Sequence, residues 1–137
     1  MTKLRVVTWN LWDRNEHPHK AIAYVTGLGA DIICLQELPT SVLPQLEKNT
    51  EYRLYRAIDA HTIKGDVYLG ILVHKDITVM QHKVVAHNKK PSTNWIEHII
   101  GWRMAFVESH SILIETEEAS VRVINCHLPV VCKIRER

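Results

Sequence analysis

The segment DIICLQEL, Asp31 to Leu38, constrains the fold more than any other part of the sequence. Its four consecutive apolar residues, 32–35, are typical of a strand that is covered on both faces. Gln36 and Glu37 follow directly, so this strand delivers an amide and a carboxylate to the rim of a sheet. The carboxyl ends of strands are places where ligands and reacting groups can sit.

A second strand and a helix precede this segment. Leu4 to Trp9 is apolar on both faces and ends at Asn10. A helix is expected next, because Pro18 suits a first turn and glycines at 27 and 29 are stop signals. Its apolar stripe consists of Ala21, Ile22, Val25 and Leu28. A strand-helix-strand unit of this kind implies two parallel strands, which places Asn10 and Glu37 at one edge of the sheet.

The rest of the chain predicts a short helix and then antiparallel strands. The helix falls in 39–48, with Leu43 and Leu46 facing inward. The last two strands form a hairpin that ends at His127. No repeat or linker interrupts the chain, so residues 1–137 are expected to form one domain. The expected strands are 52–58, 67–74, 77–87, 102–108, 111–116 and 121–127, with a loop at 87–95.

Composition narrows the class of protein. The chain is 46% hydrophobic and 23% charged, which is enough apolar content for a real core. A net charge of +2 is too small to indicate a nucleic-acid-coating arm. No apolar stretch reaches the ~20 residues of a membrane span, and no signal segment opens the chain. We therefore expect a cytoplasmic protein.

The cysteines agree with a reducing compartment. Cys34, Cys126 and Cys132 are odd in number and contain no C-x-x-C pair. Cys34 and Cys126 are expected to be small apolar residues in buried strands.

Three polar residues at strand ends are candidates for chemistry. Glu37 can bind a hard cation such as Mg²⁺, although carboxylates after strands are more often helix caps or solvated charges. Asn10 is equally compatible with a turn that hydrogen-bonds its own backbone. His127 can contact a phosphate or transfer a proton, although strand-end histidines often do neither.

Three other patterns resemble ligand-binding motifs, but for each of them a purely structural role is favoured. Gly27-Leu28-Gly29 follows a helix, whereas the glycines of a dinucleotide-binding loop precede one. His17-x-His19 has no matching cysteine pair for a zinc site. Lysines at 83, 89 and 90 lie near two tryptophans, and a solvated loop is favoured over a nucleic-acid patch.

Four strings together resemble the endonuclease/exonuclease/phosphatase superfamily, whose fold is DNase I-like. They are RVVTWNLW (Arg5 to Trp12), DIICLQEL, GILVHK (Gly70 to Lys75) and VINCHLP (Val123 to Pro129), in that superfamily's order and approximate spacing. Arg103 also stands where the superfamily often has a strand-opening arginine. The resemblance covers nearly the whole chain. It is specific because the strings occur together, whereas any single string would not be.

The resemblance implies an α/β (α+β) fold, the DNase I-like four-layer sandwich. This chain would supply about half of it, as a mixed, mainly antiparallel sheet with helices on one face. It also implies a phosphodiesterase or nuclease-type hydrolase that uses Mg²⁺, with Mn²⁺ as a second candidate. Glu37 would bind the metal, Asn10 would support the metal and orient Glu37, and His127 would contact the scissile phosphate. The substrate would be a phosphate ester of nucleic acid, phospholipid or inositol phosphate.

The resemblance is incomplete, because it matches the superfamily's N-terminal half alone. The Asp-x-Asn pair and the Ser-Asp-His string of the later half do not follow His127, and Asp13-Arg14-Asn15 stands too early to serve. We therefore expect residues 1–137 to be a truncated domain, weakly active or inactive alone. The alternative is a non-catalytic binding module on the same scaffold. One bare sheet face is expected, covered by a second copy or by the missing C-terminal half.

Overall fold

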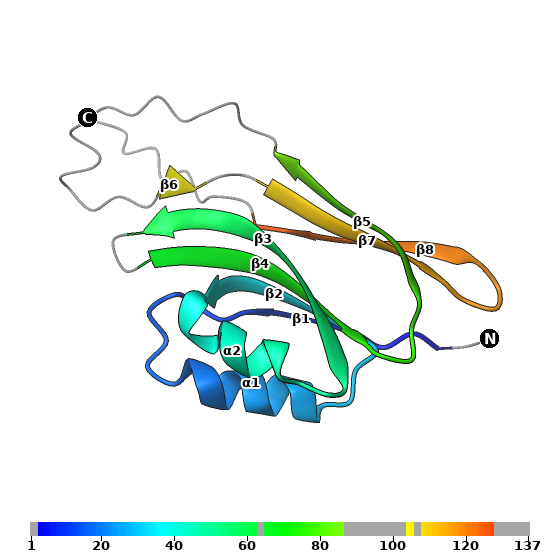
Figure 1. The fold of residues 1–137 in the computed structure, drawn as a ribbon, viewed down its shortest axis with the longest axis horizontal. Helices are drawn as coiled ribbons and strands as arrows, with labels where there is room; N and C mark the ends of the chain where they lie inside the picture. Colours follow the sequence, from blue (N-terminus) through cyan, green and yellow to red (C-terminus); the bar gives the residue numbers. More distant parts are fainter. Residues whose placement is uncertain (1–2, 63–64, 87–103, 106–107, 128–137) are drawn as a thin grey trace, which may run out of the picture.

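The structure is a computed structural model that describes residues 3–62, 65–86, 104–105 and 108–127. Two sheets and two helices account for most of these residues (Figure 1). In chain order the elements are β1 (Val6–Asn10), α1 (Pro18–Gly27), β2 (Ile32–Pro39), the 3-10 turn η1 (Thr40–Val42), α2 (Leu43–Glu47), β3 (Tyr52–Thr62), β4 (Gly65–His74), β5 (Val79–Ala86), β6 (Met104–Ala105), β7 (Glu108–Glu115) and β8 (Ser120–Cys126).

The larger sheet has the strand order β1-β2-β4-β3-β6. Strands β1 and β2 are parallel, with Asn10 opposite Gln36, and the other pairs are antiparallel. The predicted strand-helix-strand unit is therefore confirmed, and the ends of β1 and β2 lie at one edge of the sheet.

Both helices cover one face of the larger sheet (Figure 1). Pro18 stands in the first turn of α1, and Ile22 and Val25 are buried beneath the sheet. Leu28 is the exception to the predicted stripe, because the helix ends before it and leaves it 39% exposed. In α2, Leu43 and Leu46 are buried as predicted.

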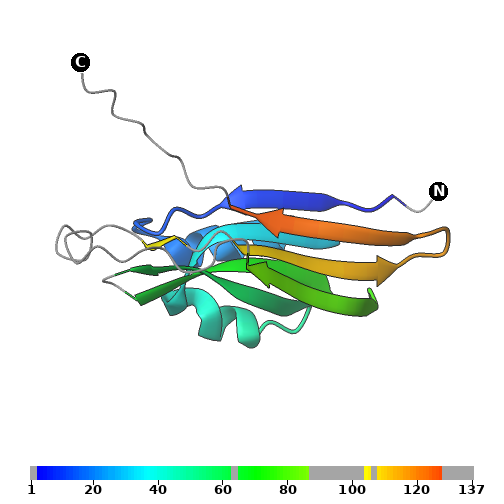
Figure 2. The same ribbon diagram turned by 90° about the horizontal axis from the view of Figure 1, so that it is seen from above.

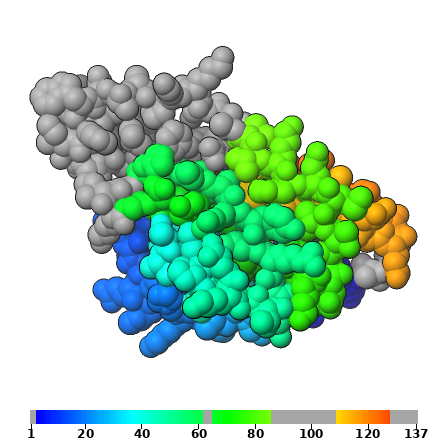
Figure 3. All heavy atoms as spheres, in the orientation of Figure 1, coloured from blue at the N-terminus to red at the C-terminus, as the bar shows by residue number. Residues whose placement is uncertain are grey.

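The other face of the larger sheet is covered by a second, three-stranded sheet of order β5-β7-β8. Ile112 and Ile114 of β7 pack against Ile32, Ile71 and Val73 of the larger sheet. The expectation of a bare sheet face is therefore wrong over this area. Figure 3 shows the tip of the β7–β8 hairpin projecting at one end of the molecule.

The strand pattern suggests that β5 continues the antiparallel sheet of β3 and β4, but the structure places β5 in the other sheet. Strands β3 and β4 are antiparallel neighbours as predicted, but β5 is antiparallel to β7 and leaves the sheet that contains β4. After the turn at Lys75 and Asp76, Ile77 and Val79 pack into the core between the two sheets, which draws β5 across.

Cys34 and Cys126 have different environments. Cys34 is buried, and burial raises the pKa of its thiol to about 11. Cys126 is exposed, so its predicted burial is wrong. Strand alternation explains the difference, because Asn125 faces the larger sheet and its neighbour must face outward.

Several sequence predictions lie outside the described residues. They are Arg103, Cys132, the loop at 87–95, the tail from 129, and most of the strand at 102–108. Of that strand, Met104 and Ala105 pair with β3, and Glu108 begins β7. Within the described ranges, no helix is both long and apolar enough to cross a bilayer.

Candidate active site

Glu37 is held at the rim by an irregularity in β2. The pairing of β2 with β4 shifts register between Leu35 and Leu38, and Glu37 has a φ of 54° within this bulge. A non-glycine residue at positive φ is uncommon and costs backbone energy, so the surrounding structure must fix it. The bulge re-aims the Glu37 side chain away from the regular alternation of the strand.

Asn10 and the loop after it hold the Glu37 carboxylate. The Asn10 Nδ2 group donates to Glu37 Oε1 at 3.3 Å, and the Asp13 backbone N–H donates to Oε2 at 3.0 Å. The Asn10 Oδ1 atom accepts from the Trp12 backbone N–H at 2.8 Å. Because a backbone N–H can only donate, this contact fixes which end of the amide faces Glu37. Asn10 is thus placed to orient Glu37.

His127 reaches the same place from the second sheet. Its Nε2 atom lies 3.4 Å from Glu37 Oε1, and its Nδ1 atom lies 2.9 Å from Asp59 Oδ2. The side chain of His127 is 23% exposed, that of Glu37 is 11% and that of Asp59 is 2%. The predicted convergence of Asn10, Glu37 and His127 is confirmed, and the site is accessible mainly through the imidazole.

Two side-chain amides, the buried Asn125 and the partly exposed Gln36, set the position of β8 over β2. Asn125 Nδ2 donates to the backbone oxygens of Leu35 and Gly70, each at 2.9 Å. Gln36 Nε2 donates to Asn125 Oδ1 at 2.6 Å and to Thr8 Oγ1 at 3.1 Å. These bonds join the two sheets one residue from Glu37 and two residues from His127.

Sequence reasoning missed Asp59 and Asn125. The strand predicted at 52–58 is four residues shorter than β3, which ends at Thr62, although strand alternation continued from Ala57 would have placed Asp59 on the inner face. Asn125 lies within the VINCHLP motif, but nothing in a single sequence marks an amide as the bridge between two sheets.

The chemistry of the donors suits a hard cation held by few protein ligands. Mg²⁺ usually binds one or two carboxylates and keeps several waters, and Glu37 is a carboxylate at a rim. Among the described residues, no group of three or more His, Cys, Asp or Glu side chains could hold a metal ion.

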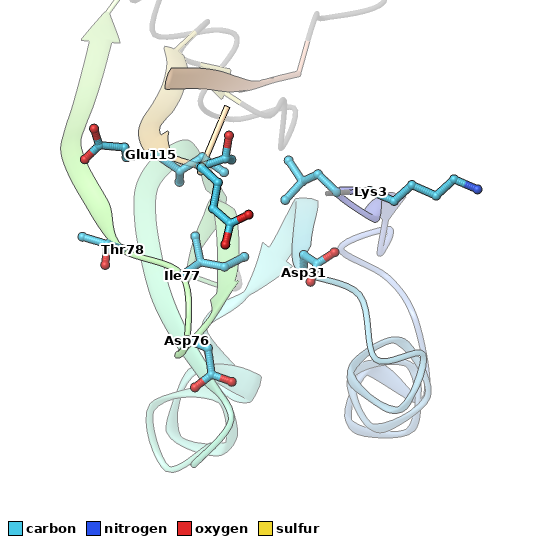
Figure 4. Close-up of a pocket in the computed structure, with 10 residues that line it drawn as sticks. Lys3, Asp31, Asp76, Ile77, Thr78 and Glu115 are labelled. Carbon is cyan, nitrogen blue, oxygen red and sulfur yellow. The ribbon is translucent and has the colours of Figure 1, made fainter. Parts of the chain in front are cut away.

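A separate cavity of about 260 Å³ lies at the opposite end of the sandwich (Figure 4). Asp31, which lines it, precedes β2, whereas Glu37 is near the end of that strand. Asp76, Glu115 and Glu117 add carboxylates, and Lys3 is the one cationic group among the described residues that line the cavity. This charge would repel an anionic phosphate ester, so the cavity is not the candidate site.

No protein-family model and no curated protein sequence matches this chain. Solved structures do match. TDP2 of D. rerio, complexed with a single-stranded DNA product, is 15% identical with a TM-score of 0.70, and the match covers 98% of this chain and 49% of that one. An endonuclease/exonuclease/phosphatase of Bacteroides vulgatus is 13% identical with a TM-score of 0.66, over 93% and 53% of the two chains. ANGEL2, a 2',3'-cyclic phosphatase, is 15% identical with a TM-score of 0.64, over 92% and 41%.

These matches establish the fold. The chain has the DNase I-like fold of endonuclease/exonuclease/phosphatase proteins, as its motifs predicted. It spans about half the length of the solved structures that it matches. The activities of those proteins differ, so the fold by itself does not assign one to this chain.

Proposed function

We propose that this chain is a Mg²⁺-dependent hydrolase-type domain for phosphate esters, whose catalytic set is incomplete within these residues. The observation that carries the proposal is the convergence of Asn10, Glu37 and His127 on one rim, from three separate strand ends. DNA and cyclic phosphates, the ligands of two proteins of this fold, make nucleic-acid esters the first substrates to test.

Each residue has a distinct role in this proposal. Glu37 would hold the cation, Mn²⁺ being able to replace Mg²⁺, with Asn10 and the Asp13 N–H keeping its carboxylate oriented. The bound cation would neutralise charge on the phosphoryl oxygens. With a proton on each ring nitrogen, His127 would donate from Nε2 to a phosphate oxygen beside Glu37. Because Glu37 and Asp59 both flank the imidazole, a cation would also offset their repulsion of an anionic ester.

Thermal melts with and without Mg²⁺ test the cation site independently of turnover. A ligand that binds only the folded chain adds ~1.4 kcal/mol at ten times its Kd, so Mg²⁺ should raise the Tm of the wild type. Glu37→Gln should lose this rise, whereas Glu115→Gln, at the distant acidic cavity, should retain it. An equal rise in the Glu37→Gln variant would refute the assignment. No rise in the wild type would favour the non-catalytic binding module.

Hydrolysis of a generic phosphodiester tests whether the catalytic set is incomplete. We expect this chain alone to show low or no EDTA-sensitive activity. Robust hydrolysis that is lost in Glu37→Gln would show instead that these residues are sufficient.

We further propose that a second copy of the chain covers the exposed apolar side chains of the two edge strands, β1 and β8. Val6 on β1 is 47% exposed and Ile124 on β8 is 60% exposed. Figure 2 shows these two edge strands along the same side of the molecule. Open strand edges beside exposed apolar side chains favour association. Light scattering should give twice the chain mass at micromolar concentration, and a monomer would contradict this proposal.

A further inference from the structure

Asp59 is an acidic residue in the interior of the molecule. It lies in the long strand β3, where the pairing with β4 shifts register between Ile58 and Ala60. It is 1% exposed, between Ala57 and Ala60, which are also buried. A carboxylate at this depth requires hydrogen-bond donors, and one of them is the imidazole of His127.

The two nitrogens of His127 have unequal contacts. Nδ1 forms a hydrogen bond of 2.9 Å with Asp59 Oδ2, whereas Nε2 lies 3.4 Å from Glu37 Oε1, a longer contact. A carboxylate can only accept, so in the neutral ring the shorter contact places the single proton on Nδ1. The lone pair then belongs to Nε2, on the side of Glu37.

We propose that Asp59 is the positioning residue for His127, fixing its ring orientation and its Nδ1–H tautomer so that protons are exchanged only at Nε2. Carboxylates play this part for many functional histidines, because the bond made by one nitrogen determines the state of the other. The contact of Nε2 with a phosphate rests on the proposed function. The assignment of the Nδ1–H tautomer does not depend on that function.

The chain contains a matched control for this pair. His61 Nδ1 lies 2.6 Å from Asp66 Oδ1, but these side chains are 45% and 38% exposed. The contact repeats the chemistry of the Asp59–His127 pair at the surface. Asp66→Asn therefore makes the same chemical change as Asp59→Asn in a place without a proposed role.

Nitrogen-15 NMR of the histidine rings tests the proposal on the metal-free chain without substrate. At about pH 9, where an ordinary imidazole is neutral, His127 of the wild type should favour Nδ1–H over Nε2–H by at least about ten-fold. Asp59→Asn should reduce this ratio to near unity, because an amide can donate as well as accept. Asp66→Asn should leave the His127 ratio unchanged.

Two results would overturn the proposal. One is an Nε2–H tautomer in the wild type, which needs no variant and so remains decisive if Asp59→Asn does not fold. The other is a ten-fold preference that survives in a folded Asp59→Asn chain. Neither result depends on hydrolysis or on Mg²⁺, so failure of this inference is distinguishable from failure of the proposed function.

Discussion

Glu37 combines a side chain at the candidate site with an unfavourable backbone conformation. At a φ of 54°, a side chain with a Cβ costs roughly 1–2 kcal/mol that glycine avoids. We therefore predict that Glu37→Gly is more stable than Glu37→Ala by about 1 kcal/mol, although both remove the carboxylate. Urea unfolding in EDTA measures the difference. If Glu37→Ala is as stable as Glu37→Gly, the left-handed conformation does not persist in solution.

His110 should make the fold sensitive to acid. Its side chain is fully buried, neither ring nitrogen has a hydrogen-bond partner among the described residues, and His82 packs against it with ring centroids 4.7 Å apart. Burial, with the neighbouring His82 as the smaller cause, lowers the pKa of His110 from 6.5 to about 4. The unfolded chain therefore binds more protons between these values, and stability falls as the pH drops below 6.5 toward 4.

The variant His110→Leu should remove this part of the acid sensitivity. Between pH 7 and pH 5 the free energy of unfolding should fall by about 2 kcal/mol less than in the wild type. Denaturant unfolding at both pH values measures this difference. His17→Gln, an exposed residue without a side-chain capping bond, should keep the wild-type dependence. Equal slopes in His110→Leu and the wild type would mean that His110 is accessible to protons in the folded state.

At the scale of elements, the site depends on how β8 is attached to β2 and β4. Asn125 makes three hydrogen bonds across the two sheets. Asn125→Ala leaves two buried carbonyl oxygens without this donor, and we predict a loss of about 2–3 kcal/mol. It should also weaken the Mg²⁺-linked rise in Tm, because His127 follows two residues later. Ile124→Ser, on the exposed face of the same strand, should cost less than about 0.5 kcal/mol. Similar losses for the two variants would contradict the bridging role.

The elements also show what the sequence could and could not predict. Asn10 and Glu37 were placed together by local rules, because a short parallel crossover brings two carboxyl ends to one edge. His127 was placed beside them by motif resemblance, since its position depends on the docking of a second sheet. The crossing of β5 into that sheet and the bulge at Glu37 were missed. Both depend on pairings between distant segments, which strand propensity and alternation do not specify.

At the scale of the whole molecule, carboxylates lie at both ends of the sandwich. Asn10, Glu37 and His127 converge at one end, with one carboxylate aimed by two donors. Asp31, Asp76 and Glu115 line the cavity at the other end (Figure 4). A net acidic cavity attracts cations by charge alone, whereas an oriented carboxylate binds them in one geometry.

Paramagnetic broadening by Mn²⁺ separates these two ends in one experiment. As Mn²⁺ is added to the labelled chain, the amide signals of Asn10, Asp13 and Glu37 should broaden first, together with the ring signals of His127. Excess Mg²⁺ should restore them, and Glu37→Gln should abolish the effect. If the signals near Asp31, Asp76 and Glu115 broaden first while those at Glu37 stay sharp, the cation site at the carboxyl edge of β1 and β2 does not exist.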